Sequence, residues 1–358
     1  MRLFFPVLTA GIALFAATGL AQKTVSADGP YHLQKTVKVG GEGGFDYVYA
    51  DPDGRRLYVA RSGPAPRVTV FNLDTLAPAG EIPQTGAHGA ATDTQSHHAF
   101  ASSSPVAMWD TKTLTVIKTI PVEGRPDGML ADSFNHRVYI FSHAAPNVTV
   151  LDAKDGAIVG TMDLGGAPEQ AASDGKGHIY VDVEDKDTVA VIDAKTMKVT
   201  AQYSLNGKGG GNAGLALDAK NHVLFVACRD PQTMVMLDAN DGKYLGALPI
   251  GRGCDGAVFN PKTGECFSSQ GDGTLTVIKE KTPTTFVVEQ TVATMTGAKT
   301  LTLDNKTGKI FLIAAEYAPT PAPTTPPAGT TPAPEGRGGG RVRRQMLPDS
   351  FSIVVVGK

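Results

Sequence analysis

A phrase of about fifteen residues recurs seven times along this 358-residue chain. Each copy has a short apolar run, an Asp or Asn, a polar turn and a second apolar or aromatic run, as in GLALDAKNHVLFVAC from Gly214. The turn residues are Asp51, Asp93, Asp132, Asp174, Asp218, Asn260 and Asp304, spaced 39 to 44 residues apart. This period is typical of one blade of a β-propeller.

A second β-rich phrase follows the first in the same repeats. It ends in a turn at Asp74, Asp110, Asp152, Asp193 and Asp238, with Lys279 in the sixth repeat. Another apolar stretch, such as KVTAQY, comes after each. Four strands of five or six residues, separated by tight turns, fill a repeat of this length. We interpret the repeated Asp residues as turn formers, because their side chains bond nearby backbone groups and tolerate left-handed geometry.

The two ends of the chain predict that the ring is closed. The final run, SFSIVVVGK, supplies only a third strand for the seventh repeat, whereas YHLQKTVKV at 31–39 has no repeat of its own. The alternative, an open solenoid, would expose strand edges at both ends and need caps. We therefore predict an all-β, seven-bladed β-propeller over residues 31–358, closed by an N-terminal strand that completes the last blade.

The repeats resemble those of the YVTN-repeat, YncE-like family of exported seven-bladed propellers. The resemblance rests on the second-strand signature LYVA at Leu57, VYIF at Val138, IYVD at Ile179 and LFVA at Leu224, with D-A-K or D-T-K turns after it. It implies an exported propeller. It does not imply one shared reaction.

The N-terminus predicts export. Arg2 precedes the apolar run 3–20, and small residues lead to a predicted cleavage after Ala21, so residues 1–21 read as a signal peptide. An uncleaved anchor fits less well, because the run is short for a bilayer and is interrupted by proline and glycine. We expect a periplasmic or secreted monomer with no membrane span after cleavage.

The charge of the chain argues against nucleic acid as a partner, and its cysteine content argues against a disulfide scaffold. The 33 Lys and Arg balance 35 Asp and Glu, so the chain lacks the basic surface of a nucleic-acid binder. Three cysteines are too few for a disulfide scaffold. Cys228 and Cys254 fall near the same end of adjacent blades, so a disulfide between them is one alternative in an oxidising compartment.

An insertion interrupts the seventh repeat at residues 318–347. It has seven prolines, and its four arginines outnumber one glutamate. Such a composition predicts a flexible, partly polyproline-like loop. It is either a solvated linker or a basic tether for a polyanion, a cell-wall component or the acidic body of the protein.

A propeller brings the loops before its first strands and after its second strands to one face, at the mouth of the channel. The positions five residues before each turn residue are Asp46, His88, Asp127, Glu169, Ala213 (preceded by Asn212), Asp255 and Lys299. A second tier after the second strands includes Arg61, His143, Asp185 and Arg229. We predict that these residues form a ligand site of mixed charge.

Four of these residues are carboxylates: Asp46, Asp127, Glu169 and Asp255. Convergent carboxylates raise one another's pKa unless a cation compensates them. Oxygen ligands favour Ca²⁺, Mg²⁺ or Mn²⁺, so the ring is a candidate divalent-cation site. The alternative is that these groups cap strand ends and bond channel water.

Four other histidines follow the turn residues by four positions: His97, His136, His178 and His222. Equivalent places in different blades cannot share one metal, so we interpret these histidines as turn residues on the opposite face.

No GxSxG, HExxH or CxxCH motif occurs in the sequence. The first hypothesis is therefore a binding module whose mouth holds a protein, peptide or cell-envelope ligand. The second is a metal-dependent lactonase or hydrolase with His88 as base. A third is a redox-associated propeller subunit.

Overall fold

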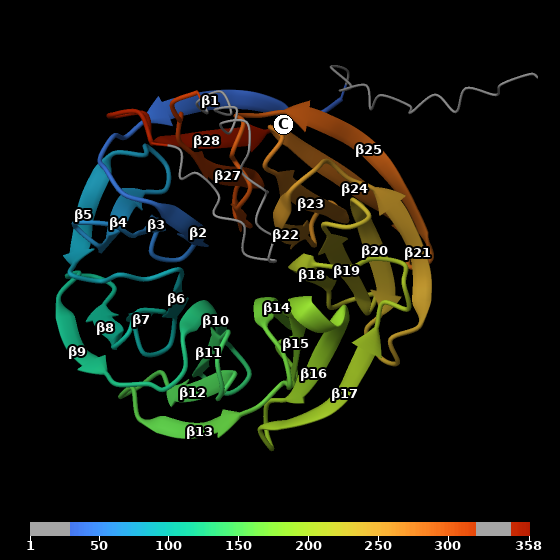
Figure 1. Ribbon diagram of the computed structural model, residues 1–358, viewed down its shortest axis with the longest axis horizontal. Coiled ribbons are helices and arrows are strands. Elements are labelled where there is room, and N and C mark those ends of the chain that lie inside the picture. Colours follow the sequence, from blue (N-terminus) through green and yellow to red (C-terminus); the bar gives the residue numbers. More distant parts are fainter. Residues whose placement is uncertain (1–28, 320–344) are drawn as a thin grey trace, which may run out of the picture.

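The computed structural model describes residues 29–319 and 345–358. Seven four-stranded antiparallel sheets form a ring (Figure 1), which confirms the predicted seven-bladed propeller. One 3₁₀ helix, η1 (Glu184–Lys186), accompanies the strands in this part of the chain. The predicted signal peptide lies outside the described residues.

The blades follow one another along the chain. Blade 1 contains β2 (Phe45–Asp51), β3 (Arg56–Arg61), β4 (Arg67–Asn72) and β5 (Pro78–Pro83). Blade 2 contains β6 (Ala90–Asp93), β7 (His98–Ala101), β8 (Val106–Asp110) and β9 (Val116–Ile120). Blade 3 contains β10 (Pro126–Asp132), β11 (Arg137–Ser142), β12 (Val148–Asp152) and β13 (Ile158–Met162). Blade 4 contains β14 (Pro168–Ser173), β15 (His178–Val183), β16 (Thr188–Asp193) and β17 (Lys198–Ser204).

The remaining blades complete the ring. Blade 5 contains β18 (Asn212–Asp218), β19 (Val223–Cys228), β20 (Thr233–Asp238) and β21 (Tyr244–Pro249). Blade 6 contains β22 (Cys254–Asn260), β23 (Glu265–Gln270), β24 (Thr274–Thr282) and β25 (Thr285–Ala293). Blade 7 contains β26 (Leu301–Asp304), β27 (Lys309–Ala314), β28 (Ser352–Gly357) and β1 (His32–Lys38).

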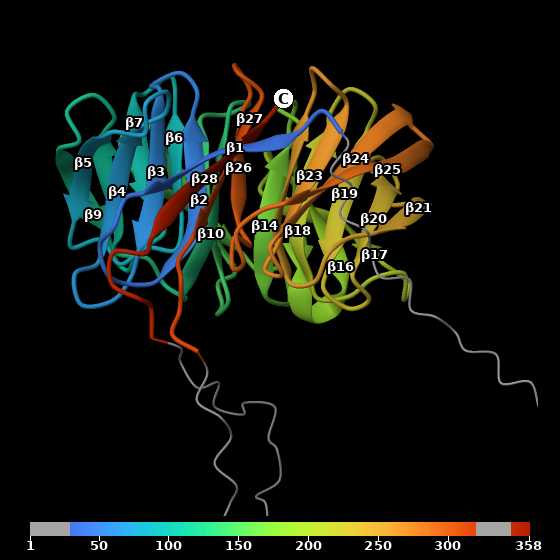
Figure 2. The ribbon, with the colours of Figure 1, turned by 90° about the horizontal axis from the view of Figure 1, so that it is seen from above.

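The N-terminal strand closes the ring as predicted. β1 pairs antiparallel with β28, with Leu33 opposite Val356 and Lys38 opposite Ser352, and both views show the two strands side by side (Figures 1 and 2). Tyr31 also ties the start of β1 to blade 6, because its backbone N–H donates to Gln290 Oε1 at 3.0 Å.

The core consists of seven apolar clusters, and each lies between two neighbouring blades. One of them joins blade 7 to blade 1 through Phe311 and Leu57. A blade therefore buries its apolar faces only when both neighbours are present, so burial of apolar surface favours the closed ring.

The turns follow the repeat closely. Six first strands end at the predicted turn residue, and β14 ends one residue earlier, at Ser173. Asp51 Oδ1 accepts bonds from the N–H groups of Asp53 and Gly54, as expected for a turn former. In blade 1 the second turn is made by Asn72, whose Oδ1 accepts from Asp74 N, so the prediction placed that turn two residues too late.

The predicted insertion begins and ends in ordered structure. Tyr317 bridges to Met346, and the N–H of Ala318 donates to the carbonyl of Gln345 at 2.8 Å. A separate antiparallel bridge beyond the β27–β28 ladder therefore holds its two ends together, and residues 320–344 lie outside the described part. Within the described ranges, no helix is long and apolar enough to cross a membrane.

Candidate functional site

In six of the seven blades, the start of the first strand or the loop just before it carries a polar side chain to the mouth of the channel. Four carboxylates occupy the second position of their strands: Asp46 in β2, Asp127 in β10, Glu169 in β14 and Asp255 in β22. His88 and Lys299 come shortly before β6 and β26. Six blades thus supply polar groups to one mouth.

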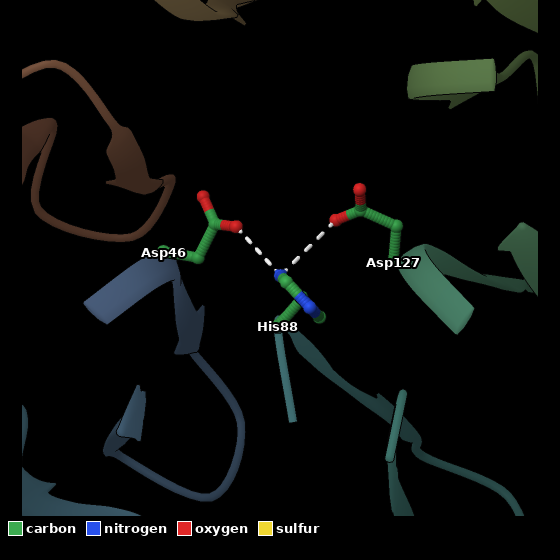
Figure 3. Close-up of side chains that lie close together, drawn as sticks. All are labelled: Asp46, His88 and Asp127. Atoms are coloured by element: carbon green, nitrogen blue, oxygen red, sulfur yellow. Dashed lines mark hydrogen bonds and ion pairs between the residues drawn. The ribbon is translucent and has the colours of Figure 1, made fainter. Parts of the chain in front are cut away.

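A chain of alternating carboxylates and histidines crosses blades 1 to 4, and we call it the histidine half of the mouth. Its members are Asp46, His88, Asp127, His143 and Glu169. His88 Nδ1 lies 2.8 Å from Asp46 Oδ2 and 3.5 Å from Asp127 Oδ1 (Figure 3). One imidazole nitrogen therefore faces two carboxylates from different blades.

His143 continues the chain. Its Nε2 lies 3.1 Å from Asp127 Oδ2 and 3.6 Å from Glu169 Oε1. On the other side of Glu169, the Tyr47 hydroxyl donates to Oε2 at 3.2 Å. A continuous path of polar contacts thus runs from blade 1 to blade 4.

These contacts shift the proton affinity of the group. Burial raises the pKa of Asp127 to about 6, although His88 opposes the shift. The hydrogen bond to Asp46 raises the pKa of His88, and the hydrogen bond to Glu169 raises the pKa of His143. Asp127, His88 and His143 therefore bind protons more tightly than free side chains do, and a bound cation would compete with those protons.

Blades 4 to 7 form the arginine half, made of Glu184, Arg229, Asp255 and Lys299. Arg229 pairs through Nη1 with Glu184 and through Nη2 with Asp255, and Lys299 also pairs with Asp255. The charges of Asp255 and Glu184 raise the pKa of Arg229 despite its burial. Cations of the chain itself neutralise this half.

Of the carboxylates predicted to form a cation site, Asp46 and Asp127 come together with His88. Among the described residues, one group of three potential ligands has donor atoms within 4.8 Å of one another: Asp46, His88 and Asp127. Asp255 is occupied by Arg229 and Lys299, and Glu169 lies against His143 and Tyr47. The candidate site is thus two carboxylates and an imidazole, which suits Mn²⁺ and also admits Zn²⁺.

Three predicted mouth residues lie elsewhere. Arg61 is 1% exposed and donates to backbone carbonyls, including those of Gly41 and Glu42 at 3.1 Å. Its guanidinium also stacks on Phe351, 3.7 Å from the ring centroid. The side chain of Arg61 therefore holds the loop before β2 in place and does not face a ligand.

Asp185 and Asn212 also differ from the prediction. Asp185 accepts a bond from Ala167 N at 2.7 Å and is half exposed, so it caps a loop outside both halves. Asn212 is fully buried, and its Nδ2 donates to Asp182 Oδ1 at 2.8 Å. Burial raises the pKa of Asp182 well above the usual range.

The structure adds residues that sequence reasoning missed. Glu184 and Tyr47 are adjacent in sequence to the predicted Asp185 and Asp46. At the mouth, Glu184 pairs with Arg229, and the Tyr47 hydroxyl donates to Glu169. Gln170 joins blade 4 to blades 5 and 6, because its Oε1 accepts from the N–H groups of Leu215 and Ala257 at 3.0 and 2.9 Å. A cavity of about 320 Å³ lies inside the channel and includes Tyr47 and Gln170 in its walls.

The cysteines and the remaining histidines have no place in the mouth. Cys228, Cys254 and Cys266 are free, buried thiols, so the disulfide considered for the first two is not formed. The four repeat histidines lie in or beside the turns of the opposite face. His97, His136 and His222 have positive φ values of 60°, 54° and 56°, and His178 begins β15.

No protein-family model matches the sequence, and no curated protein matches it. Among solved structures, 1615 chains match. One of them, from a crystal structure of a mitotic checkpoint complex, has a TM-score of 0.69 at 13% identity, covering 85% of this chain and 95% of that chain. This similarity shows the β-propeller fold alone, so the resemblance to YVTN-repeat proteins stays a prediction.

Proposed function

We propose that this chain is an exported interaction module that binds the cationic group of a peptide, protein or cell-envelope ligand at the channel mouth. The fold is one that commonly serves as a rigid platform for binding. The resemblance to YVTN-repeat proteins and the predicted signal peptide support export. Similarity to a chain from a checkpoint complex is an analogy of fold and names no partner.

The observation that carries the proposal is the charge of the mouth. Its two halves contain five carboxylates, from Asp46, Asp127, Glu169, Glu184 and Asp255. They contain two permanent cations, Arg229 and Lys299. The net charge of these groups is −3 (2 − 5) with neutral histidines and −1 (4 − 5) when both histidines are protonated, and Arg125, whose Nη2 lies 3.3 Å from His143 Nδ1, adds one positive charge beside them. A cationic group is therefore attracted most strongly when the histidines are neutral.

The test uses chain 22–358 with labelled trilysine and triglutamate as probes. We expect trilysine to bind and triglutamate not to bind, with affinity falling as salt screens the mouth. The double variant Asp46→Asn/Asp127→Asn should weaken trilysine binding at least about tenfold. Asp185→Asn, on the same face but outside both halves, is the matched control. Equal binding of the two probes would overturn the proposal, as would an unchanged affinity in the double variant.

Export has its own test. Expression in a bacterial host, followed by mass measurement of the exported chain, should give an N-terminus at Gln22. An uncleaved chain retained in the membrane fraction would contradict it.

The second candidate is a metal-dependent hydrolase, favoured by the convergence of Asp46, His88 and Asp127. A cation held there would activate water and polarise a carbonyl. Chelator-treated protein should gain lactone or ester hydrolysis when Mn²⁺ or Zn²⁺ is restored, and His88→Asn should lose it. If a cation binds without any turnover, the mouth is a binding site and this candidate is wrong.

A further inference from the structure

A cavity of about 320 Å³ lies in the channel next to the histidine half of the mouth. Its walls consist mainly of the residues that follow Asp46, His88, Asp127 and Glu169 along the chain, at 47–49, 89–91, 128–131, 170 and 171. Because the first strands run from the mouth into the channel, the cavity begins where the histidine half ends. Its volume is within the usual range for small-molecule sites.

Several apolar side chains contribute to these walls. Met129, Leu130 and Val258 are half-buried, and Leu301 is buried beside them. Contact with a hydrocarbon group would remove the exposed part of these side chains from water, which is favourable.

The neutral polar side chains of the walls are already bonded within the protein. The Tyr47 hydroxyl donates to Glu169 Oε2 at 3.2 Å, and the Tyr49 hydroxyl lies 3.1 Å from a threonine hydroxyl of blade 2. Gln170 bonds backbone groups of blades 5 and 6 through both Oε1 and Nε2, and Thr302 Oγ1 accepts from a backbone N–H of blade 1. These contacts favour an apolar ligand group over a polar one, because a polar group would find few free side-chain partners.

Asp127 is the carboxylate above the cavity that most needs a donor. Its side chain is 14% exposed, and His88 Nδ1, which bonds Asp46, stays 3.5 Å away (Figure 3). His143 Nε2 lies 3.1 Å from Asp127 Oδ2 but is buried without a hydrogen-bond partner in residues 29–319 and 345–358. A largely buried carboxylate in this state favours a ligand that brings N–H groups and positive charge.

We propose that the ligand of the mouth is an amphiphilic amine, with its ammonium group at Asp46 and Asp127 and an alkyl or arylalkyl tail in the cavity. The inference rests on the proposed function, which requires only a cationic group. An ammonium group has three donors, so it can bond both carboxylates at once. Each methylene group of the tail that leaves water adds to the affinity.

The experiment measures displacement of labelled trilysine from chain 22–358 by three amines of equal charge. Methylammonium has almost no tail, hexylammonium has an apolar tail, and protonated 2-(2-aminoethoxy)ethanol has a polar tail of the same length. We expect hexylammonium to displace trilysine at a concentration at least about thirtyfold lower than methylammonium. The polar-tailed amine should stay within about threefold of methylammonium.

Variants of the cavity wall separate the tail from the charged head. Met129→Gln/Leu130→Asn keeps the size of both side chains and should reduce the advantage of hexylammonium at least about fivefold. Its affinities for trilysine and methylammonium should stay the same, which also shows that the mouth is folded. Leu217→Asn is the matched control, because Leu217 lines a separate hollow of the channel and not this cavity.

The outcomes distinguish this inference from the proposed function. If trilysine does not bind, both are wrong. If trilysine binds but hexylammonium is no better than methylammonium or the polar-tailed amine, the mouth binds cations and the amphiphilic ligand is wrong. An equal loss of the hexylammonium advantage in Leu217→Asn and in the wall variant would also overturn it.

Discussion

The two halves of the mouth bring carboxylates together in different ways. In the histidine half, Asp46 and Asp127 share the nitrogen of His88, whose charge depends on pH. In the arginine half, Asp255 is held between Arg229 and Lys299, which stay charged. The same repeat position therefore supplies an exchangeable site on one side and a neutralised, structural pair on the other. The partner of a carboxylate, rather than its place in the repeat, decides its role.

The largest expected difference between the halves concerns cation binding. Asp127→Asn should reduce Mn²⁺ affinity about a hundredfold, equivalent to about 2.7 kcal/mol, because it removes one of three ligands. Asp255→Asn should leave the affinity unchanged, because the charge it removes is already paired. Calorimetric titration of chelator-treated protein measures both. Equal losses in the two variants would mean that the halves act as one ring.

The free energy of unfolding should depend more on the arginine half than on the histidine half. Arg229→Met leaves Glu184 and Asp255 without their shared cation, and we expect a loss of about 2 kcal/mol in the free energy of unfolding at pH 7. This expected loss of stability is smaller than for a fully buried ion pair, because the Arg229 side chain is 35% exposed. Urea unfolding measures the change, with Arg252→Met, an exposed residue outside both halves, as the control. A similar loss in both variants would argue against a special role for the arginine half.

The pH dependence of stability should come from the histidine half. The pKa of His143 is raised in the folded state, so its contribution is full below the unfolded value of about 6.5 and is lost as pH rises through the higher folded value. Asp127 acts with the same sign at lower pH, since burial raises its pKa from 3.8 to about 6. The free energy of unfolding should therefore fall less between pH 6 and pH 8 in His143→Asn than in the parent. An unchanged slope would contradict the assignment.

The smallest effect is expected for Asp185, which belongs to neither half. Asp185→Asn keeps an oxygen that can accept from Ala167 N, so the free energy of unfolding should change by less than about 0.5 kcal/mol. Cation affinity should also stay the same. A loss in either measurement would extend the mouth to this loop and weaken the comparison between the halves.

Much of the architecture could be predicted because it depends on local patterns. The same pattern of alternating strands and tight turns occurs in seven copies, each about as long as one blade. Each copy therefore predicts the same supersecondary unit. Six predicted turn residues end their first strands, and β1 completes the last blade. The candidate mouth was predicted as a set of positions for the same reason, since every first strand begins at the same end of the ring.

The contacts within the mouth could not be predicted from the repeat. Arg61 is the last residue of β3 and pairs with Phe45, whereas Arg229 comes one place after β19, whose last residue Cys228 pairs with Asn212. Neighbouring strand positions point to opposite sides, so Arg61 turns to the loop before β2 and to Phe351, and Arg229 reaches Asp255. Glu184, rather than the predicted Asp185, holds the corresponding place directly after β15 and therefore meets Arg229.

The order of the residues thus determines the seven blades, the closure of the ring and the end of the channel at which polar groups collect. These features depend on backbone periodicity and apolar burial, which the chain encodes locally. Which carboxylates meet a histidine and which meet an arginine was decided by the folded ring. The physical reason is that such partners lie 16 to 45 residues apart in the chain, nearly all on different blades, and packing of the blades sets the ångström-scale distances between them.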